Sequence, residues 1–322
     1  MAFDVLKPGL STTIQDLGRP GYFHLGIPEG GAMDRFALRV ANMLVGNDEG
    51  AAGLEAVFMG PELRFTTDTL VAVTGAEMPI LVDGAPREGW SAFMVRAGQV
   101  LSFGFLKAGA RICIAFAGGI DTPPALGSRS TYPIGGLGGL DGRALAAGDV
   151  VPVAQGGTLE RSLDRGLIPR MEAPVPLRVL PGLYWHRLTP AAQDRFFADD
   201  WTVAPEADRM GYRFRGGHPM EFVARAQPFG AGSDPSNIVD GCYSYGSIQV
   251  PGGQEPIVLH RDAVSGGGYF TLGAVISADM DLIGQLQPNT KVRFVQVSMD
   301  EALAARHART AALDKIRAEL CR

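Results

Sequence analysis

The sequence predicts a mainly β protein made of two tandem β-rich domains with a few helices. Most of the chain consists of apolar runs of four to eight residues separated by Gly, Pro, Asp or Asn, which is typical of strands joined by turns. Its 322 residues include 43 glycines and 22 prolines, yet 46% are hydrophobic, so many turns are expected and disorder is not. A weak internal repeat indicates that the β-rich unit occurs twice.

The clearest strand signals lie in both halves of the chain. Each is a short apolar run with a turn residue at its end, and strands in this number imply barrels or sandwiches. They cover residues 63–66, 70–75, 79–84, 99–105, 111–119, 247–252, 256–260 and 291–297.

Three segments break this pattern and are expected to be helical. Asp34 and Gly46 are placed to cap a helix between them, which has an apolar stripe. Thr189 followed by Pro190 predicts the start of a second helix that ends near residue 198.

The third predicted helix is long and lies at the C-terminus. Ser298 and Glu301 form a capping box at its start. Its apolar residues Leu313, Ile316 and Leu320 are expected to dock on the body of the protein or on a partner.

The repeat sets the predicted domain boundaries. Three short strings recur in order at offsets of about 174, 190 and 191 residues, and one insertion of about 16 residues around the Thr189 helix reconciles these offsets. The proline-bearing segment MEAPVP follows the first copy, so we expect domains at 1–172 and 173–322. The pairs are DVLKPG (4–9) with RVLPG (178–182), GRPGY (18–22) with DRMGY (208–212), and AGQVLSF (97–103) with PNTKVRF (288–294).

Charge and cysteine usage exclude several classes of function. The 29 basic and 34 acidic residues leave a net charge of −5, without the basic excess expected of a protein that binds nucleic acid or an anionic membrane. The three cysteines lack CxxC spacing, which argues against a disulfide framework or a structural zinc site. With no signal peptide and no long apolar stretch, we expect a soluble cytoplasmic protein with neither nucleic acid nor membrane as partner.

The strongest candidate for chemistry follows the strand at 256–260. His260 ends this strand, and Arg261, Asp262, Ser265 and three glycines follow it. An imidazole, a guanidinium and a carboxylate at a strand end can supply a general base, an oxyanion clamp and an orienting group. A strand-end salt bridge with a solvated arginine is an equally open interpretation. The five histidines include no HxH or HExxH pair, so no metal site is expected.

Arg129 is a second candidate. It lies in a polar cluster, residues 128–132, just before the glycine run at 135–142, and such clusters bind carboxylates or phosphates. A polar surface loop is the alternative. Arg19 and Arg209 each precede a Gly-Tyr pair, and they are expected to close a turn or to pair with Asp16 and Asp208. No GxSxG elbow is present and Cys113 lies in an apolar strand, so a covalent mechanism is not indicated.

Taken together, several strings resemble one family from end to end. The sequence resembles the biotin-dependent carboxyltransferase family, which includes the C subunit of the prokaryotic 5-oxoprolinase, the Kip-type (KipA-like) antagonist proteins and the carboxyltransferase domain of urea carboxylase. The strings include TTIQDLGRPGY (12–22), GGAMDRFALRVANMLVGN (30–47), LEAVFMGPELRF (54–65), AFAGGID (115–121), LGSRSTY (126–132), GGLGGLDGRAL (135–145), DRMGYRF (208–214) and GSIQVPGGQEPIVL (246–259).

The resemblance implies a fold, a reaction and partners. The fold would be two tandem cyclophilin-like β-barrel domains. The reaction would be the ATP-dependent opening of 5-oxoproline, or a related lactam or amide, by a complex with two partners: a Kip-inhibitor-like (KipI-like) protein as the B component and a lactam-utilisation-type (LamB/YcsF-type) protein as the A component. ATP would be bound together with the partner, and this chain would be inactive alone. Because it contains no Met-Lys-Met site, no biotin is expected on this chain.

The same resemblance leaves two other functions open. One is the transfer of a carboxyl group from carboxybiotin to a urea-like nitrogen, and the other is a regulatory antagonist of a kinase inhibitor. The loop at 260–270 also departs from the family pattern: a Gln-Thr pair is lost and the His260-Arg261 pair is gained. We therefore expect a substrate that differs from 5-oxoproline. The predicted catalytic residues are His260, Arg261 and Asp262, and the predicted substrate-binding residues are Arg129, Ser265, Gly267 and Tyr269.

Overall fold

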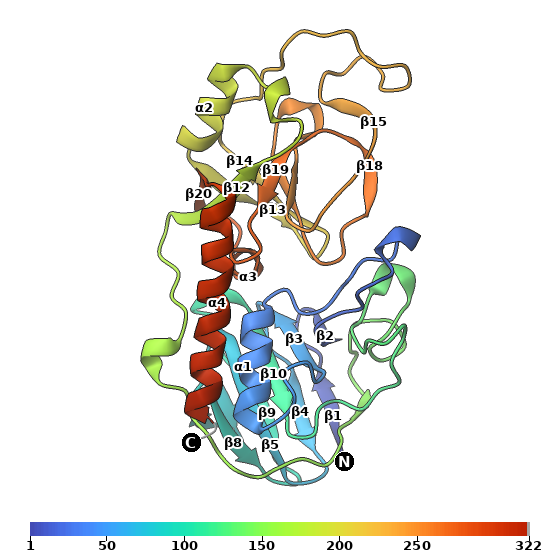
Figure 1. The fold of residues 1–322 in the computed structure, drawn as a ribbon. Helices are drawn as coiled ribbons and strands as arrows, with labels where there is room; N and C mark the ends of the chain where they lie inside the picture. Colours follow the sequence, from blue (N-terminus) through green and yellow to red (C-terminus); the bar gives the residue numbers. More distant parts are fainter. Residues whose placement is uncertain (321–322) are drawn as a thin grey trace. The chain divides into compact units, whose positions relative to one another are not determined.

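The computed structural model describes residues 1–320, which are mainly β, as predicted, and include four α-helices. Cys321 lies outside the described residues. The chain divides into two compact units (Figure 1). Unit 1 comprises Met1–Pro20, Gly30–Pro169 and the chain from Thr310 onward, and unit 2 comprises Gly21–Glu29 and Arg170–Arg309.

Unit 1 contains two antiparallel sheets. One has six strands in the order β11-β1-β4-β9-β6-β7, and the other has five in the order β2-β3-β10-β5-β8. The strands of the first sheet are β1 (Ala2–Lys7), β4 (Glu62–Phe65), β6 (Ile80–Val82), β7 (Ala85–Arg87), β9 (Val100–Phe103) and β11 (Val150–Pro152). Those of the second are β2 (Thr12–Gln15), β3 (Gly53–Val57), β5 (Thr69–Glu77), β8 (Ser91–Val95) and β10 (Ala108–Phe116).

The core of unit 1 is formed by residues from both sheets. Phe3 and Phe116 stack with their ring centroids 4.7 Å apart, and Phe65 packs against both rings. All three side chains are fully buried or nearly so. Aromatic rings bury large apolar areas, which explains why short strands suffice to hold the two sheets together.

Helix α1 (Arg35–Val45) has the caps that the sequence predicts. The Asp34 carboxylate accepts a hydrogen bond from the backbone N–H of Ala37 at 2.8 Å, and Gly46 ends the helix with φ of 78°. Its apolar stripe, which includes Val40 and Leu44, packs against β5, β8 and β10. The helix is therefore fixed by local caps and by burial of one face.

The last part of α4 (Met299–Leu320) docks on unit 1 beside α1 (Figure 1). Leu313 and Ile316 are 2% and 1% exposed, and Leu320 packs against the same cluster. The predicted docking on the body of the protein is thus confirmed. The division also differs from the predicted boundaries, because this apolar docking places the end of α4 with unit 1, while Gly21–Glu29 belong to unit 2.

Unit 2 contains a closed seven-stranded barrel in the order β12-β19-β16-β17-β14-β13-β20. A parallel pairing of β12 with β20 closes it, and the other pairings are antiparallel. The strands are β12 (Val175–Pro181), β13 (Trp201–Ala207), β14 (Gly211–Arg215), β16 (Ser247–Gln249), β17 (Ile257–Leu259), β19 (Thr271–Val275) and β20 (Lys291–Gln296).

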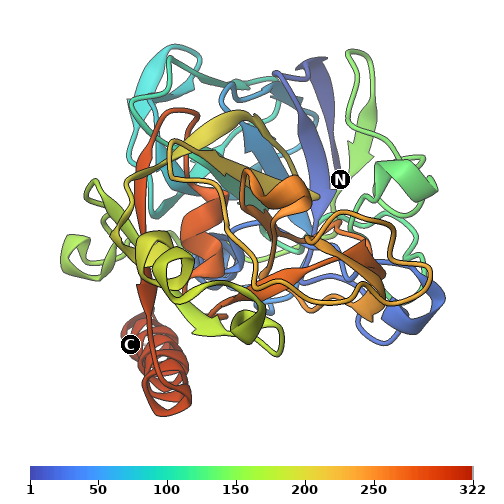
Figure 2. The same cartoon turned by 90° about the horizontal axis from the view of Figure 1, so that it is seen from above.

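Smaller elements complete the two units. Helix α2 (Pro190–Ala198), capped by Thr189 as predicted, lies against β20 (Figures 1 and 2). The rings of Phe196 and Phe294 stack there with their centroids 4.7 Å apart. The sequence did not predict α3 (Met280–Gly284) or the two-stranded sheet of β15 (Asn237–Cys242) and β18 (Gly266–Tyr269). Single-turn 3₁₀ helices occur at η1 (Phe23–Leu25), η2 (Pro133–Gly135), η3 (Arg165–Leu167), η4 (Trp185–Arg187) and η5 (Pro251–Gly253).

One of the three sequence echoes has no structural counterpart. Residues 208–210 form the turn between β13 and β14, and residues 211–212 begin β14, whereas residues 18–22 lie in the long connection between β2 and β3. Adjacent Gly and Tyr in a loop are too common to fix equivalence by themselves.

Shortening a buried side chain of α4 should destabilise the protein. We expect Ile316→Ala to lower the free energy of unfolding by about 2–5 kcal/mol, because it leaves a cavity in the cluster shared with α1. Lys315→Ala, at an exposed position of the same helix, should have little effect. Urea denaturation followed by circular dichroism measures both, and equal stabilities of the two variants would contradict this docking.

The two described cysteines should differ sharply in reactivity. Burial, with the nearby carboxylates of Glu55 and Asp34, raises the pKa of the Cys113 thiol well above its usual value, so it stays protonated near neutral pH. Cys242 is exposed. In a Cys321→Ser background, a thiol reagent should label Cys242 at once and Cys113 only after unfolding, and rapid labelling of both in the native protein would disprove this.

Candidate functional site

The loop after β17 is joined to the turn between β13 and β14 by backbone hydrogen bonds. The N–H of His260 donates to the carbonyl of Met210, and that of Asp262 donates to the carbonyl of Arg209, each at 2.8 Å. His260, Arg261 and Asp262 are 2%, 5% and 4% exposed. The three predicted catalytic residues are therefore brought together by one fixed loop in unit 2.

Asp262 forms a bidentate ion pair with Arg209. The Nε of Arg209 lies 2.7 Å from Oδ2 of Asp262, and Nη2 lies 3.0 Å from Oδ1. The sequence had not assigned this carboxylate to Arg209. Asp208, the expected partner, accepts the backbone N–H groups of Met210 and Gly211 through Oδ1, which closes the turn. A planar, bidentate pair of this kind fixes the orientation of both groups.

Arg261 stacks on an aromatic ring. Its guanidinium carbon lies 4.0 Å from the ring centroid of Tyr245, and its Nη1 lies 3.5 Å from Oε2 of Glu29. The Tyr245 ring also meets the His260 ring edge-on at 5.3 Å. Arg261 is thus partnered and buried, which rules out the solvated strand-end arginine of the alternative interpretation.

His260 has one ring nitrogen engaged by the backbone. Nε2 lies 3.0 Å from the carbonyl oxygen of Met280, and a carbonyl can only accept, so Nε2 carries the hydrogen. The second nitrogen, Nδ1, is then the one that takes up a proton when the ring becomes charged. A general-base role for His260 remains a prediction that would act through Nδ1.

The predicted substrate-binding residues of this loop are organised by Tyr243, whose role the sequence did not reveal. Its hydroxyl accepts the N–H of Tyr269 at 2.7 Å and donates to the Tyr269 carbonyl at 3.0 Å. Its own N–H donates to the Ser265 carbonyl at 2.9 Å. A Cβ at Gly267 would lie 3.2 Å from this ring and its hydroxyl, so a side chain there would crowd Tyr243. Burial raises the pKa of Tyr243, which keeps the hydroxyl a donor.

A hollow of about 470 Å³ borders this loop within unit 2. Leu259, Ala263 and Val264 contribute one side, and the β13–β14 turn contributes Asp208 and Met210. Polar groups among largely apolar walls are typical of sites for small molecules. The residues that line the hollow include none of the predicted catalytic or substrate-binding residues, whose loop lies beside it. We take the hollow and the adjoining loop together as the candidate site.

Arg129 belongs to a different constellation, in unit 1. Asp16 organises that loop: its carboxylate accepts the hydroxyls of Ser128 and Ser130 at 2.7 and 2.5 Å and the N–H of Arg129 at 2.6 Å. The Arg129 side chain donates to the Thr122 carbonyl at 2.7 Å and lies 3.0 Å from Asp121. Buried Arg19 donates to the carbonyl of Ser130. The structure thus gives Arg129 a loop-bracing role, and substrate binding by it stays a prediction.

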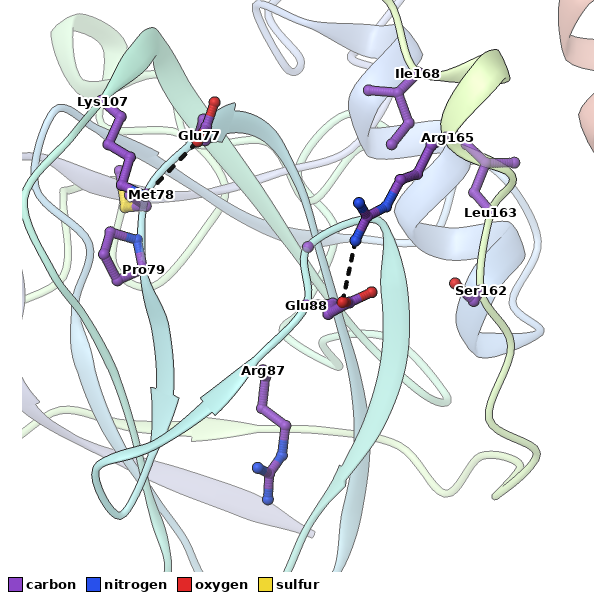
Figure 3. Close-up of a pocket in the computed structure, with 11 residues that line it drawn as sticks. Glu77, Met78, Pro79, Arg87, Glu88, Lys107, Ser162, Leu163, Arg165 and Ile168 are labelled. Carbon is purple, nitrogen blue, oxygen red and sulfur yellow. Dashed lines mark hydrogen bonds and ion pairs between the residues drawn. The ribbon is translucent and has the colours of Figure 1, made fainter.

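Unit 1 also has an open hollow of about 430 Å³, drawn in Figure 3. Four of its five charged side chains form two pairs: Lys107 with Glu77 at 3.8 Å and Arg165 with Glu88 at 3.2 Å, while Arg87 donates to the backbone carbonyl of Pro86. These exposed pairs neutralise each other and contribute little to binding or stability. Within the described residues there is no group of three potential metal-ligating side chains, and no helix is long and apolar enough to span a membrane.

Comparison with known proteins identifies the family. The family model for the carboxyltransferase domain, subdomain A and B, matches residues 25–296. The chain belongs to this carboxyltransferase-domain family. The resemblance noted in the sequence is thereby confirmed.

Two kinds of relative share this domain. The chain is 38% identical to the C subunit of 5-oxoprolinase from Escherichia coli, over 94% of this chain and 93% of that protein. It is 33% identical to the urea amidolyase of Lachancea kluyveri over 98% of this chain, which is only 18% of that protein. The crystal structure of the Kluyveromyces lactis urea carboxylase superposes with a TM-score of 0.91 at 32% identity, over 98% of this chain and 29% of that one.

Breaking the pair between Arg209 and Asp262 should destabilise this carboxyltransferase-family domain strongly. Asp262→Asn should lower the free energy of unfolding by about 3–5 kcal/mol, since it leaves a largely buried guanidinium without its carboxylate. A double-mutant cycle with Arg209→Gln measures the coupling. The half-exposed pair of Arg213 and Glu255 is the matched control, with an expected coupling of about 0–1 kcal/mol. Equal coupling in the two pairs would refute the organising role of Asp262.

Proposed function

We propose that this chain is the C-type component of an ATP-dependent enzyme that opens 5-oxoproline or a related lactam or amide. It would act with a KipI-like B component and a LamB/YcsF-type A component, in the cytoplasm. The supporting observation is the end-to-end match with the C subunit of 5-oxoprolinase: 94% of this chain corresponds to 93% of the E. coli protein. The match with the C subunit of 5-oxoprolinase from Haemophilus influenzae covers 98% of this chain and 97% of that protein.

Lactam chemistry explains why ATP would be needed. Amide resonance in an unstrained five-membered lactam resists attack by water. Transfer of the ATP γ-phosphoryl group to the lactam oxygen would make the ring carbon more electrophilic, so that water could add to it and the C–N bond could break. The ring nitrogen would leave as the amine, and hydrolysis of the resulting acyl phosphate would release the carboxylate and inorganic phosphate. The developing negative charge must then be stabilised by fixed donors. In the candidate site these would come from Arg261 and from the loop of Ser265, Gly267 and Tyr269, while His260 would exchange a proton through Nδ1.

A carboxyl transfer to a urea-like nitrogen is the second candidate. It is favoured by the close structural match to the K. lactis urea carboxylase, with a TM-score of 0.91. Biotin would arrive on another protein, since this chain has no Met-Lys-Met site. The match covers 29% of that enzyme, so the described domain corresponds to only one part of such a system.

Turnover in reconstituted mixtures separates the two functions. The purified chain should not hydrolyse ATP alone, and 5-oxoproline or a related lactam or amide should stimulate hydrolysis once the KipI-like and LamB/YcsF-type partners are added. Glutamate release measures the complete reaction. The same mixture should not consume carboxybiotin in the presence of urea.

The controls make the result decisive. Omitting each protein in turn identifies the ones that turnover requires. Complex formation without any ATP hydrolysis, for 5-oxoproline and for a panel of lactams and amides, would contradict the proposal. Urea-dependent loss of carboxybiotin would establish the second candidate instead.

A further inference from the structure

Arg187, at the end of η4 in unit 2, is a buried cation without an acidic partner. Its side chain is 5% exposed, and no carboxylate of the described residues forms an ion pair with it. Its hydrogen bonds run from Nη2 to two backbone carbonyls, those of Pro235 at 2.5 Å and Asn237 at 3.4 Å. Nε and Nη1 are buried and have no acceptor among residues 1–320.

The surroundings add positive charge and aromatic faces. Arg225 donates to the same Asn237 carbonyl at 3.4 Å, so two guanidinium groups converge there. The guanidinium carbon of Arg187 lies 5.3 Å from the Phe270 centroid and 5.9 Å from that of Tyr184. The nearby carboxylate of Asp234 is occupied by the N–H and hydroxyl of Ser236.

This arrangement is costly unless an anion completes it. A buried ionised group that lacks a counter-charge destabilises a fold by several kcal/mol, and arginine does not escape by losing its proton at physiological pH. Burial, and then the charge of Arg225, lower the pKa of Arg187. Neutral carbonyls and ring faces compensate only part of the charge.

We propose that Arg187 and Arg225 form a binding site for an oxyanion, either a carboxylate or a phosphate group. The site adjoins the candidate substrate loop, because Asn237 pairs with Tyr269 across β15 and β18 and Phe270 follows directly. Its ligand would be the carboxylate of a lactam acid or a phosphate of the nucleotide. Access of an anion to Nε and Nη1 requires the segment at 225–235, which has no helix or strand, to shift aside.

Calorimetric binding to the full chain alone tests this site. The probes are inorganic phosphate, ATP, 5-oxoproline and 2-pyrrolidinone, which is the same lactam ring without a carboxylate. At least one anion should bind, and Arg187→Met should weaken that binding by about 10- to 100-fold, the effect of losing charge-assisted hydrogen bonds. Arg215→Met, at an exposed arginine of the same unit, should leave it unchanged.

The probes also identify the source of the anion. Binding of phosphate and ATP indicates the nucleotide, whereas binding of 5-oxoproline but not 2-pyrrolidinone indicates the substrate carboxylate. No binding of any anion, or equal affinity in wild type and Arg187→Met, overturns the proposal. Should Arg187→Met fold poorly, Arg225→Gln decides: several-fold weaker and more salt-sensitive binding supports the site, and unchanged affinity refutes it.

This inference deepens the proposed function but can fail separately from it. Binding is measured without partners or turnover, so anion binding with no ATP hydrolysis in the reconstituted mixture would retain the site and reject the enzyme role. Turnover in the reconstituted mixture, together with unaltered anion binding in both arginine variants, would retain the enzyme role and reject the site. Without ligand, Arg187→Met should have a melting temperature equal to or above that of wild type, because it removes an uncompensated buried charge.

Discussion

The ion pair between Arg209 and Asp262 determines the form of the candidate site. It joins the turn of β13 and β14 to the loop after β17, and the two backbone hydrogen bonds beside it fix the register of that contact. Because Asp262 is held, His260 and Arg261 are held with it, one against Met280 and the other against Tyr245. The glycine-rich segment that follows can then be aligned by Tyr243. Without the ion pair, the position of Asp262, and with it the positions of His260 and Arg261, would be less well fixed.

In unit 1, too, one carboxylate orders a loop, but its hydrogen-bond partners are of a different kind. There the carboxylate of Asp16 gathers two hydroxyls and a backbone N–H from the loop at 128–130. Asp262 faces a cation, and Asp16 faces neutral donors. A carboxylate that accepts several hydrogen bonds orders a loop that has no regular structure of its own. Sequence alone shows two polar, glycine-rich loops, but not that a single carboxylate orders each one.

What the sequence predicted well was local. The caps of α1, α2 and α4 depend on residues within a few positions of each other, and all three were correctly placed. The strands that consist of apolar runs were also correctly predicted. By contrast, the sequence of β18, GGGY, predicts a turn. Its pairing with β15 depends on backbone hydrogen bonds, which the side-chain pattern does not reveal. The partner of Arg209 lies 53 positions away, and no local pattern encodes such a distance.

Comparison of the buried arginines shows why Arg187 is unusual. Arg111 lies 3.9 Å from Glu55 with both side chains at most 4% exposed, and Arg209 has the two oxygens of Asp262. In both cases a carboxylate within the same unit offsets the loss of hydration. Arg187 has carbonyls and rings in that place, so its charge remains only partly compensated. A ligand that binds only the native state adds its binding free energy to the stability of the fold. The imbalance at Arg187 would then be resolved by an anion from outside the chain, which would couple the stability of this unit to occupation of the site.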